Sequence, residues 1–176
     1  MPAENAVTLR PAEAGDAAAV ARIWYLGWQD GHLGNVPDEL LAIRTEDSFT
    51  ARAAQRIEDT TDTTVATVDG SVVGFVMVVE DEVEQVYVAR EHRGSGVAAL
   101  LLADAERLVA EAGYEQAWLA VVGGNARARR FYERGGWRDE GRFDYAAASE
   151  DGPIPVPSHR YVKDVTPPAR STPPAP

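Results

Sequence analysis

The sequence contains no cysteine. This absence excludes a disulfide framework, a thiolate metal site and a cysteine nucleophile, and it agrees with a reducing, cytoplasmic location. Long apolar runs are absent too: nowhere do about 18 apolar residues follow one another, and no apolar stretch flanked by basic residues lies at the N-terminus. We therefore expect neither secretion through an N-terminal signal nor insertion into a membrane.

Basic residues are scarce, with 17 Lys and Arg against 28 Asp and Glu, for a net charge of −11. A field of that sign opposes nucleic-acid binding and favours cationic partners, although solubility alone also accounts for it. The three histidines, His32, His92 and His159, are dispersed and form no metal-ligand pattern. We therefore expect no nucleic-acid partner and no metal.

The hydrophobic pattern predicts a single α/β domain with a mixed, α+β type of sheet. A chain of 176 residues with 45% hydrophobic residues can build one substantial core. Helices are expected where apolar residues recur at intervals of three and four residues, and strands are expected where β-branched residues cluster. The expected strands span 7–10, 64–68, 72–79, 83–88, 116–122, 142–147 and 159–165, and the expected helices span 12–29, 47–57, about 96–112 and 125–134, with a further one opening at Pro37.

Two boundaries follow from glycine and proline. Gly27, Gly31 and Gly34 are expected to end the first helix in a loop that runs to about Pro37. The domain is assigned to residues 1–165, and residues 166–176, with five prolines in eleven positions, are predicted to be a disordered tail.

The segment Arg93-Gly94-Ser95-Gly96 lies between a predicted strand and a predicted helix. A helix N-terminus offers unpaired N–H groups and partial positive charge, which suits a phosphate. Glycine lets the backbone approach an anion closely, since it has no Cβ, and Arg93 adds positive charge to an acidic chain. A turn without function explains an isolated cluster of this kind equally well.

The segment from Gly123 to Trp137 makes the functional interpretation stronger. Asn125 suits a helix N-cap, and Gly135 lies just past the predicted end. One face of this predicted helix carries Asn125, Ala128 and Tyr132. The Tyr132 hydroxyl lies at the far end of that face.

Together these two segments resemble the GNAT superfamily, the acyl-CoA-dependent N-acyltransferases. Arg93-Gly94-Ser95-Gly96-Val97-Ala98 fits its (Gln/Arg)-x-x-Gly-x-(Gly/Ala) signature, and the resemblance covers roughly residues 6–165. It implies a GNAT-like fold, in which a mostly antiparallel sheet of about seven strands is flanked by about four helices. It also implies acetyl-CoA as co-substrate, a small-molecule or peptide amine as acceptor, and a homodimer as a common assembly.

The resemblance also implies roles for individual residues. The backbone from Arg93 to Ala98 would hold the pyrophosphate of coenzyme A. Main-chain groups of the strand Val86-Tyr87-Val88 would pair with the pantetheine arm, and Asn125 and Ala128 would line its other side. Arg129 and Arg130 are the candidates for the 3′-phosphate, although a charged solvent face explains most of the arginines in this helix better.

Amine acylation itself requires a base for the ammonium and an acid for the leaving thiolate. Tyr132 is predicted to be the general acid, because a phenol is protonated at neutral pH. Glu84 is the candidate base, because it is expected to share a strand face with Val86; a solvated acidic turn is the equal alternative.

The acceptor pocket of such a fold is expected between the first helices and the late strands. Trp28, Asp30, His32 and Tyr145 are therefore candidate substrate-binding residues. The leading hypothesis is an N-acetyltransferase that uses direct attack on the thioester. The alternative is a non-catalytic acyl-CoA-binding module or sensor of the same fold.

Overall fold

The computed structural model describes residues 6–59 and 62–166. The predicted tail therefore lies outside the described residues, except for Thr166. The α-helices are α1 (Ala17–His32), α2 (Asp38–Ile43), α3 (Glu46–Glu58), α4 (Val97–Glu111) and α5 (Ala126–Arg134), with 3₁₀ turns at Ala14–Asp16 and Arg90–His92. The strands are β1 (Thr8–Pro11), β2 (Asp62–Val68), β3 (Ser71–Val79), β4 (Glu82–Val88), β5 (Gln116–Val122), β6 (Arg138–Ala147) and β7 (Ile154–Asp164).

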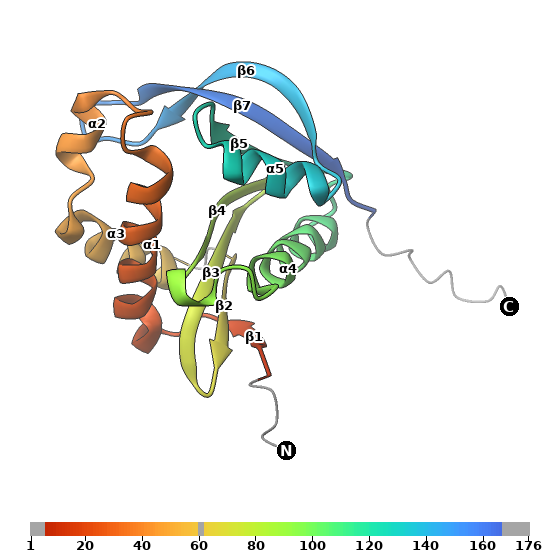
Figure 1. The fold of residues 1–176 in the computed structure, drawn as a ribbon. Helices are drawn as coiled ribbons and strands as arrows, with labels where there is room; N and C mark the ends of the chain where they lie inside the picture. The colour runs from red at the N-terminus through yellow and green to blue at the C-terminus, as the bar shows by residue number, and fades with distance from the viewer. Residues whose placement is uncertain (1–5, 60–61, 167–176) are drawn as a thin grey trace, which may run out of the picture.

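The seven strands form one sheet in the order β1-β2-β3-β4-β5-β7-β6 (Figure 1). All neighbouring pairs are antiparallel except β4 and β5, which are parallel. The predicted fold class, a single mixed and mostly antiparallel sheet with helices on its faces, is therefore confirmed.

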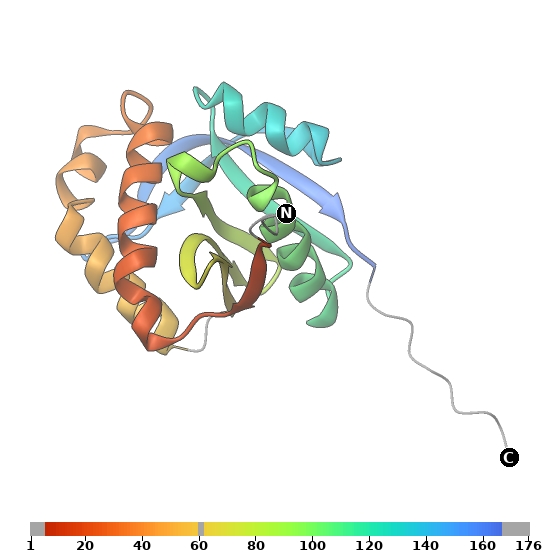
Figure 2. The same ribbon diagram turned by 60° about the horizontal axis from the view of Figure 1, so that its bottom comes forward.

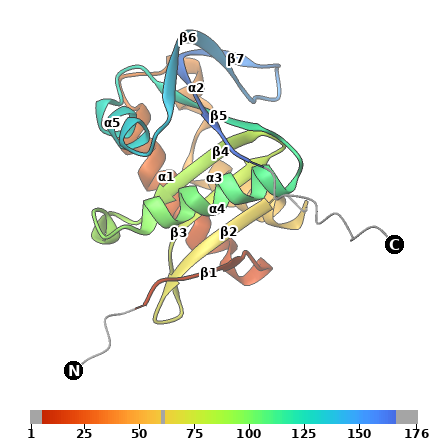
Figure 3. The same ribbon diagram turned by 90° about the vertical axis from the view of Figure 1, so that its right-hand side faces the viewer.

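Helices cover both faces of this sheet. Helices α1, α2 and α3 lie on one side, and α4 and α5 lie on the other (Figure 2). Helix α4 crosses β2 to β4, and the β6–β7 hairpin projects at the end of the sheet away from β1 (Figure 3). The central strand β3 is buried on both faces: Phe75 and Met77 pack toward α1 and α3, and Val76 and Val78 pack toward α4. This burial explains why β3 is a continuous apolar run without alternation.

The structure corrects the predicted end of the first helix. Helix α1 continues through Gly27 and Gly31 to His32. Both glycines mark close approach, because a Cβ at Gly27 would collide with the Tyr87 ring and one at Gly31 would lie 2.8 Å from Asn125 Nδ2. Because glycine has no side chain, α1 can lie directly against β4 and against the start of α5.

Strand β7 begins five residues before the predicted start, at Ile154, although Pro155 and Pro157 interrupt the pattern. The two prolines pair with β6 only, beyond the last residue that pairs with β5. Proline is accepted there because this part of β7 has no second neighbouring strand to receive an N–H.

Candidate active site

The strands β4 and β5 diverge, and this divergence creates the candidate site. Their register holds one pair, Glu82 opposite Trp118, and the Trp118 N–H donates to the Asp81 carbonyl at 3.0 Å. From Val83 onward β4 has no neighbouring strand on that side among the described residues. One edge of a central strand is therefore open.

The register of β3 and β4 shows which main-chain groups face this open edge. The Ala89 N–H donates to the Val73 carbonyl at 2.8 Å, and Tyr87 pairs with Phe75. Because main-chain groups of successive residues alternate in direction, Val86 and Val88 direct their N–H and C=O groups away from β3. These groups can accept an extended ligand as if it were a strand. Tyr87 contributes its buried ring instead, 5.9 Å from that of Phe75.

Helix α5 supplies the opposite wall. Asn125, Ala128 and Tyr132 line one cavity of about 550 Å³ together with Val86 and Tyr87. The Asn125 Oδ1 accepts the Ala128 N–H at 3.2 Å and so caps the helix. The structure thus brings the predicted helix face opposite the open strand edge.

Tyr132 has a free hydroxyl in this cavity. No hydrogen bond to it is formed by residues 6–59 or 62–166, while its ring packs against Phe131 at 5.2 Å and Trp137 at 6.2 Å between centroids. Burial raises the pKa of Tyr132 to about 12. The phenol is therefore a fixed proton donor without a competing acceptor.

The loop before α4 has a backbone geometry that depends on its two glycines. Gly94 has φ +77° and Gly96 has φ +88°, a left-handed conformation that glycine adopts without strain. Buried Val97 and half-buried Ala98 then anchor the first turn of α4, and the Ser95 hydroxyl donates to the His92 carbonyl. The free N–H groups of that first turn are available to a phosphate.

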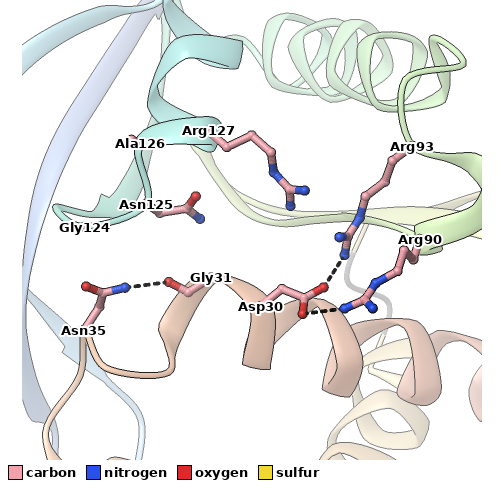
Figure 4. Close-up of a pocket in the computed structure, with 9 residues that line it drawn as sticks. All are labelled: Asp30, Gly31, Asn35, Arg90, Arg93, Gly124, Asn125, Ala126 and Arg127. Atoms are coloured by element: carbon pink, nitrogen blue, oxygen red, sulfur yellow. Dashed lines mark hydrogen bonds and ion pairs between the residues drawn. The ribbon is translucent and has the colours of Figure 1, made fainter.

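Arginines surround a second cavity, of about 660 Å³, beside this loop (Figure 4). Its lining includes Arg90 and Arg93, together with Asn125 and Arg127 at the start of α5. In Figure 4 the Arg127 side chain points into the space between Asn125 and Arg93. In a chain of net charge −11, this concentration of guanidinium groups favours a polyanionic ligand.

Asp30 does not lie with the acceptor pocket as predicted. It is in the last turn of α1 and bridges Arg90 and Arg93 at 2.9 and 2.8 Å (Figure 4). Burial alone would raise the pKa of its carboxyl, but the hydrogen bonds and charges of Arg93 and Arg90 together outweigh that effect and lower the pKa. The physical reason for the difference is that α1 is longer than predicted, which turns Asp30 toward Arg93 in the loop before α4.

Arg129 is also placed differently from the prediction, because it does not line the arginine-rich cavity. Its guanidinium contacts the Tyr161 hydroxyl at 3.1 Å, the Gly123 carbonyl at 3.3 Å and Asp139 at 3.3 Å. These contacts hold α5 against β7. Arg127 is the α5 arginine that faces the cavity, and its position just after the N-cap is the sequence signal that could have identified it.

A β-bulge changes the assignment of Glu84. The register passes from Met77 opposite Gln85 to Val78 opposite Val83, so Glu84 has no partner on β3. The extra residue re-aims the strand: Glu84 contacts Arg56 of α3, whereas Val86 packs toward α4 and α5. The expectation that Glu84 shares the face of Val86 is therefore wrong. Both oxygens of Glu84 are occupied by Arg56.

Glu82 is the carboxyl that sequence reasoning missed. It lines the same cavity as Tyr132, and the Tyr145 hydroxyl donates to its Oε1 at 2.7 Å. Burial raises the pKa of Glu82 above its ordinary value, and the Tyr145 hydrogen bond opposes this shift. Glu82 has no arginine partner among the described residues, so it can accept a proton.

Helices α1 to α3 and the β6–β7 hairpin close the other end of the cavity. Trp28, His32 and Tyr145 line it as predicted, with the Trp28 and His32 rings stacked at 4.7 Å. Sequence reasoning missed Arg44, and it missed Arg52 and Arg56, whose i, i+4 spacing on α3 could have placed them on one face.

Comparison with known proteins identifies the family. The model of the acetyltransferase (GNAT) family matches residues 20–137, which include β4, the phosphate loop and α5. The chain belongs to the GNAT acetyltransferase family. Three curated relatives, uncharacterized N-acetyltransferases of Mycobacterium bovis and of two strains of Mycobacterium tuberculosis, are each 32% identical over 78 residues, or 42% of this chain. The matched segment is 50% of each relative, so the chain spans about half the length of the curated relatives it matches.

Solved structures of GNAT acetyltransferases share the fold. An N-acetyltransferase from Staphylococcus aureus is 17% identical with a TM-score of 0.68, over 92% of this chain and 99% of that one. A putative acetyltransferase from Salmonella typhimurium, solved with its cofactor acetyl-CoA, is 19% identical with a TM-score of 0.66, over 97% and 99%. At these identities the likeness concerns the fold.

The described part of this GNAT protein contains no helix long and apolar enough to cross a membrane. Nor do residues 6–59 and 62–166 hold a cluster of three or more His, Asp or Glu side chains that could bind a metal ion.

His32 gives this GNAT protein an expected acid sensitivity. Burial lowers the pKa of His32 from 6.5 to about 4, so the folded chain keeps the ring neutral where the unfolded chain protonates it. The contribution of His32 to the stability of the folded state is therefore fully present above pH 6.5, and it is lost as the pH falls toward 4. At about 1.4 kcal/mol per unit, this residue accounts for up to about 3 kcal/mol.

His32→Gln should accordingly flatten the dependence of unfolding free energy on pH between 6.5 and 4, as measured by urea denaturation. His92, which lies at the surface loop before α4, provides the matched control. If His92→Gln flattens the curve and His32→Gln does not, the assignment to His32 is wrong.

Proposed function

We propose that this protein transfers an acetyl group from acetyl-CoA to a primary amine of a small molecule or peptide. The observation that carries the proposal is the open edge of β4 opposite α5. Main-chain groups of Val86 and Val88 point away from β3, and Val86 lines a cavity together with Asn125 and Tyr132. Membership of an acetyltransferase family supports it, and the similarity to N-acetyltransferases favours nitrogen as the acceptor atom.

The residues present fit coenzyme A along its whole length. The loop from Arg93 to Ala98 would hold the pyrophosphate, Arg127 would add charge to the phosphate end, and Val86 and Val88 would bind the pantetheine arm as an added strand. Asn125 would contact that arm through its Nδ2 group, since its Oδ1 caps α5.

Acetyl-CoA supplies the acetyl group as a thioester. Glu82 takes the proton of the acceptor ammonium, directly or through one water, which frees the nitrogen lone pair to form the C–N bond. The Val88 N–H stabilises the negative charge that develops on the carbonyl oxygen. As the C–S bond breaks, Tyr132 donates its proton to the sulfur. The resulting phenolate takes the second amine proton, which restores Tyr132, and Glu82 releases the first proton to solvent.

The pKa of Tyr132 is consistent with this role. A phenol with a pKa of about 12 is protonated across the neutral range, and the same burial raises the pKa of a thiol that leaves beside it. The pKa values of the Tyr132 phenol and of the leaving thiol are therefore raised together, so the phenol can still donate its proton to the thiolate.

The alternative is a non-catalytic acyl-CoA-binding module. It would need the open strand edge and the arginine-rich cavity, but neither the free Tyr132 hydroxyl nor a Glu82 carboxylate without an arginine partner among the described residues. These two groups favour the enzyme. Assembly as a homodimer stays a prediction.

Thermal unfolding with acetyl-CoA tests the proposal. A ligand at about 100 times its dissociation constant adds about 2.7 kcal/mol to the stability of the folded state, so the melting temperature should rise with acetyl-CoA. ATP at the same concentration is the control for phosphate binding alone. If acetyl-CoA produces no rise, or ATP produces an equal one, the proposal is wrong.

A further inference from the structure

The acceptor end of the cavity is lined by an unusual number of arginines for so acidic a chain. Arg44, Arg52 and Arg56 all contribute to it. Of these, Arg56 is neutralised by Glu84, and both side chains of the pair are less than one fifth exposed. Arg52 and Arg44 have no such carboxylate partner among the described residues.

Arg52 has no carboxylate partner and no hydrogen bond among the described residues. Its guanidinium lies 4.5 Å above the Trp24 ring and 5.6 Å from that of Phe49. Burial lowers the pKa of Arg52 to about 10, so the group is still cationic at neutral pH. Aromatic faces offset part of the cost of burying this charge, but they satisfy none of its five N–H donors.

Arg44 adds a second charge without a carboxylate partner in the described part of the chain. One guanidinium nitrogen donates to the Ala148 carbonyl at 2.7 Å, which fixes the end of α2 to the β6–β7 hairpin. The positive charge of Arg44 is close enough to lower the pKa of Arg52. Two like charges held together beside a cavity are costly unless an anion is bound between them.

We infer that the acceptor is an amine that also carries an anionic group, with an amino acid as the simplest class. Arg52 and Arg44 would bind the anion, since a guanidinium fork matches a carboxylate with two parallel hydrogen bonds. Glu82 lines the same cavity and would receive the ammonium. One cavity of about 550 Å³ then offers opposite charges to the two ends of a zwitterion. A polyamine would bring its second cation against Arg52.

This inference rests on the proposed acetyl transfer and narrows its substrate. The test compares matched pairs of acceptors: L-phenylalanine with phenethylamine, L-leucine with isopentylamine, and β-alanine with ethylamine, together with spermidine. Thiol release from acetyl-CoA gives kcat/KM for each. We expect every carboxylate-bearing acceptor to be preferred over its partner by 10-fold or more.

Variants then assign the preference to the arginine. Arg52→Met keeps the apolar contact with Trp24, and it should raise the KM of the amino acids at least 10-fold while the KM of acetyl-CoA stays unchanged. Arg52→Lys keeps the charge but loses the fork, and it should give an intermediate loss. Arg22→Met, at an exposed position of α1, is the matched control and should leave all constants unchanged. A shift in melting temperature with acetyl-CoA verifies that each variant is folded and binds cofactor.

The outcomes distinguish a failure of the inferred acceptor class from a failure of the proposed acetyl transfer. If acetyl-CoA binds but amines without an anion are used as well as or better than the amino acids, or if no anionic amine accelerates thiol release, the inference fails and acetyl-CoA binding stands. If Arg52→Met and Arg52→Lys both retain the preference, the assignment to Arg52 is overturned. If acetyl-CoA itself does not bind, the proposed function fails first.

Discussion

Replacing Tyr132 with phenylalanine is expected to lower kcat by roughly 100- to 1,000-fold, the usual contribution of a positioned proton donor. The change removes one oxygen, and that oxygen has no hydrogen-bond partner in the described protein, so the packing against Phe131 and Trp137 is retained. The rise in melting temperature caused by acetyl-CoA should therefore remain. Steady-state thiol release and thermal unfolding measure the two quantities on the same sample.

Tyr114→Phe is the matched control for this experiment, since Tyr114 is 37% exposed in the turn after α4. It should change neither kcat nor cofactor binding. A Tyr132→Phe protein with undiminished turnover would remove the tyrosine from the mechanism. Because burial holds the pKa of Tyr132 at about 12, the kcat of the unmodified protein should also show no loss of an acid up to about pH 10.

Sequence reasoning succeeded where a local pattern determines local structure. The start of α4 just after Gly96 and the Asn125 cap of α5 each depend on a few neighbouring residues, and they follow from glycine punctuation and from side-chain capping. The sheet also followed, because strands rich in β-branched residues define it and Asp69-Gly70, a dipeptide typical of tight turns, connects β2 to β3. These elements place the site, and their order along the chain carries the resemblance to the family.

The errors arose where distant segments decide the outcome. Gly27 and Gly31 were interpreted as helix breakers, yet they are needed because Tyr87 and Asn125, which are remote in sequence, lie against α1. That longer helix in turn moved Asp30 from the acceptor pocket to Arg93. No pattern within α1 contains this information, since a glycine at a close approach looks the same as one at a turn.

The bulge at Glu84 is the error with the largest chemical consequence. Alternation along a regular strand assigns every second side chain to one face, and a single extra residue reverses the assignment for all residues before it. Val83 consequently packs with the α4 side of the core, and the carboxyls of Glu82 and Glu84 both lie toward α1 to α3. The register with β3 reveals the bulge, and the side-chain hydrogen bonds show that Arg56 binds Glu84 whereas Tyr145 contacts Glu82.

Replacing Glu82 with glutamine should lower kcat/KM at pH 7 by roughly 100-fold or more, because the amide can still accept the Tyr145 hydrogen bond but cannot take a proton. In the unmodified protein, burial raises the pKa of Glu82. Activity should therefore fall on the acid side at a pH above that of an ordinary glutamate, and this limb of the kcat/KM profile should vanish in the variant.

Glu84→Gln is the matched comparison, and it separates a base from an ion-pair partner. It leaves the guanidinium of Arg56 largely buried without its carboxylate, so unfolding free energy should drop by about 1–3 kcal/mol, while the acid limb persists. If instead Glu84→Gln abolishes the limb and Glu82→Gln preserves it, the proton is taken by Glu84, and the Arg56 pair must open during turnover. We therefore expect Glu82→Gln to remove the acid limb of the pH profile and Glu84→Gln to lower the unfolding free energy. Measuring both quantities for both variants assigns the base.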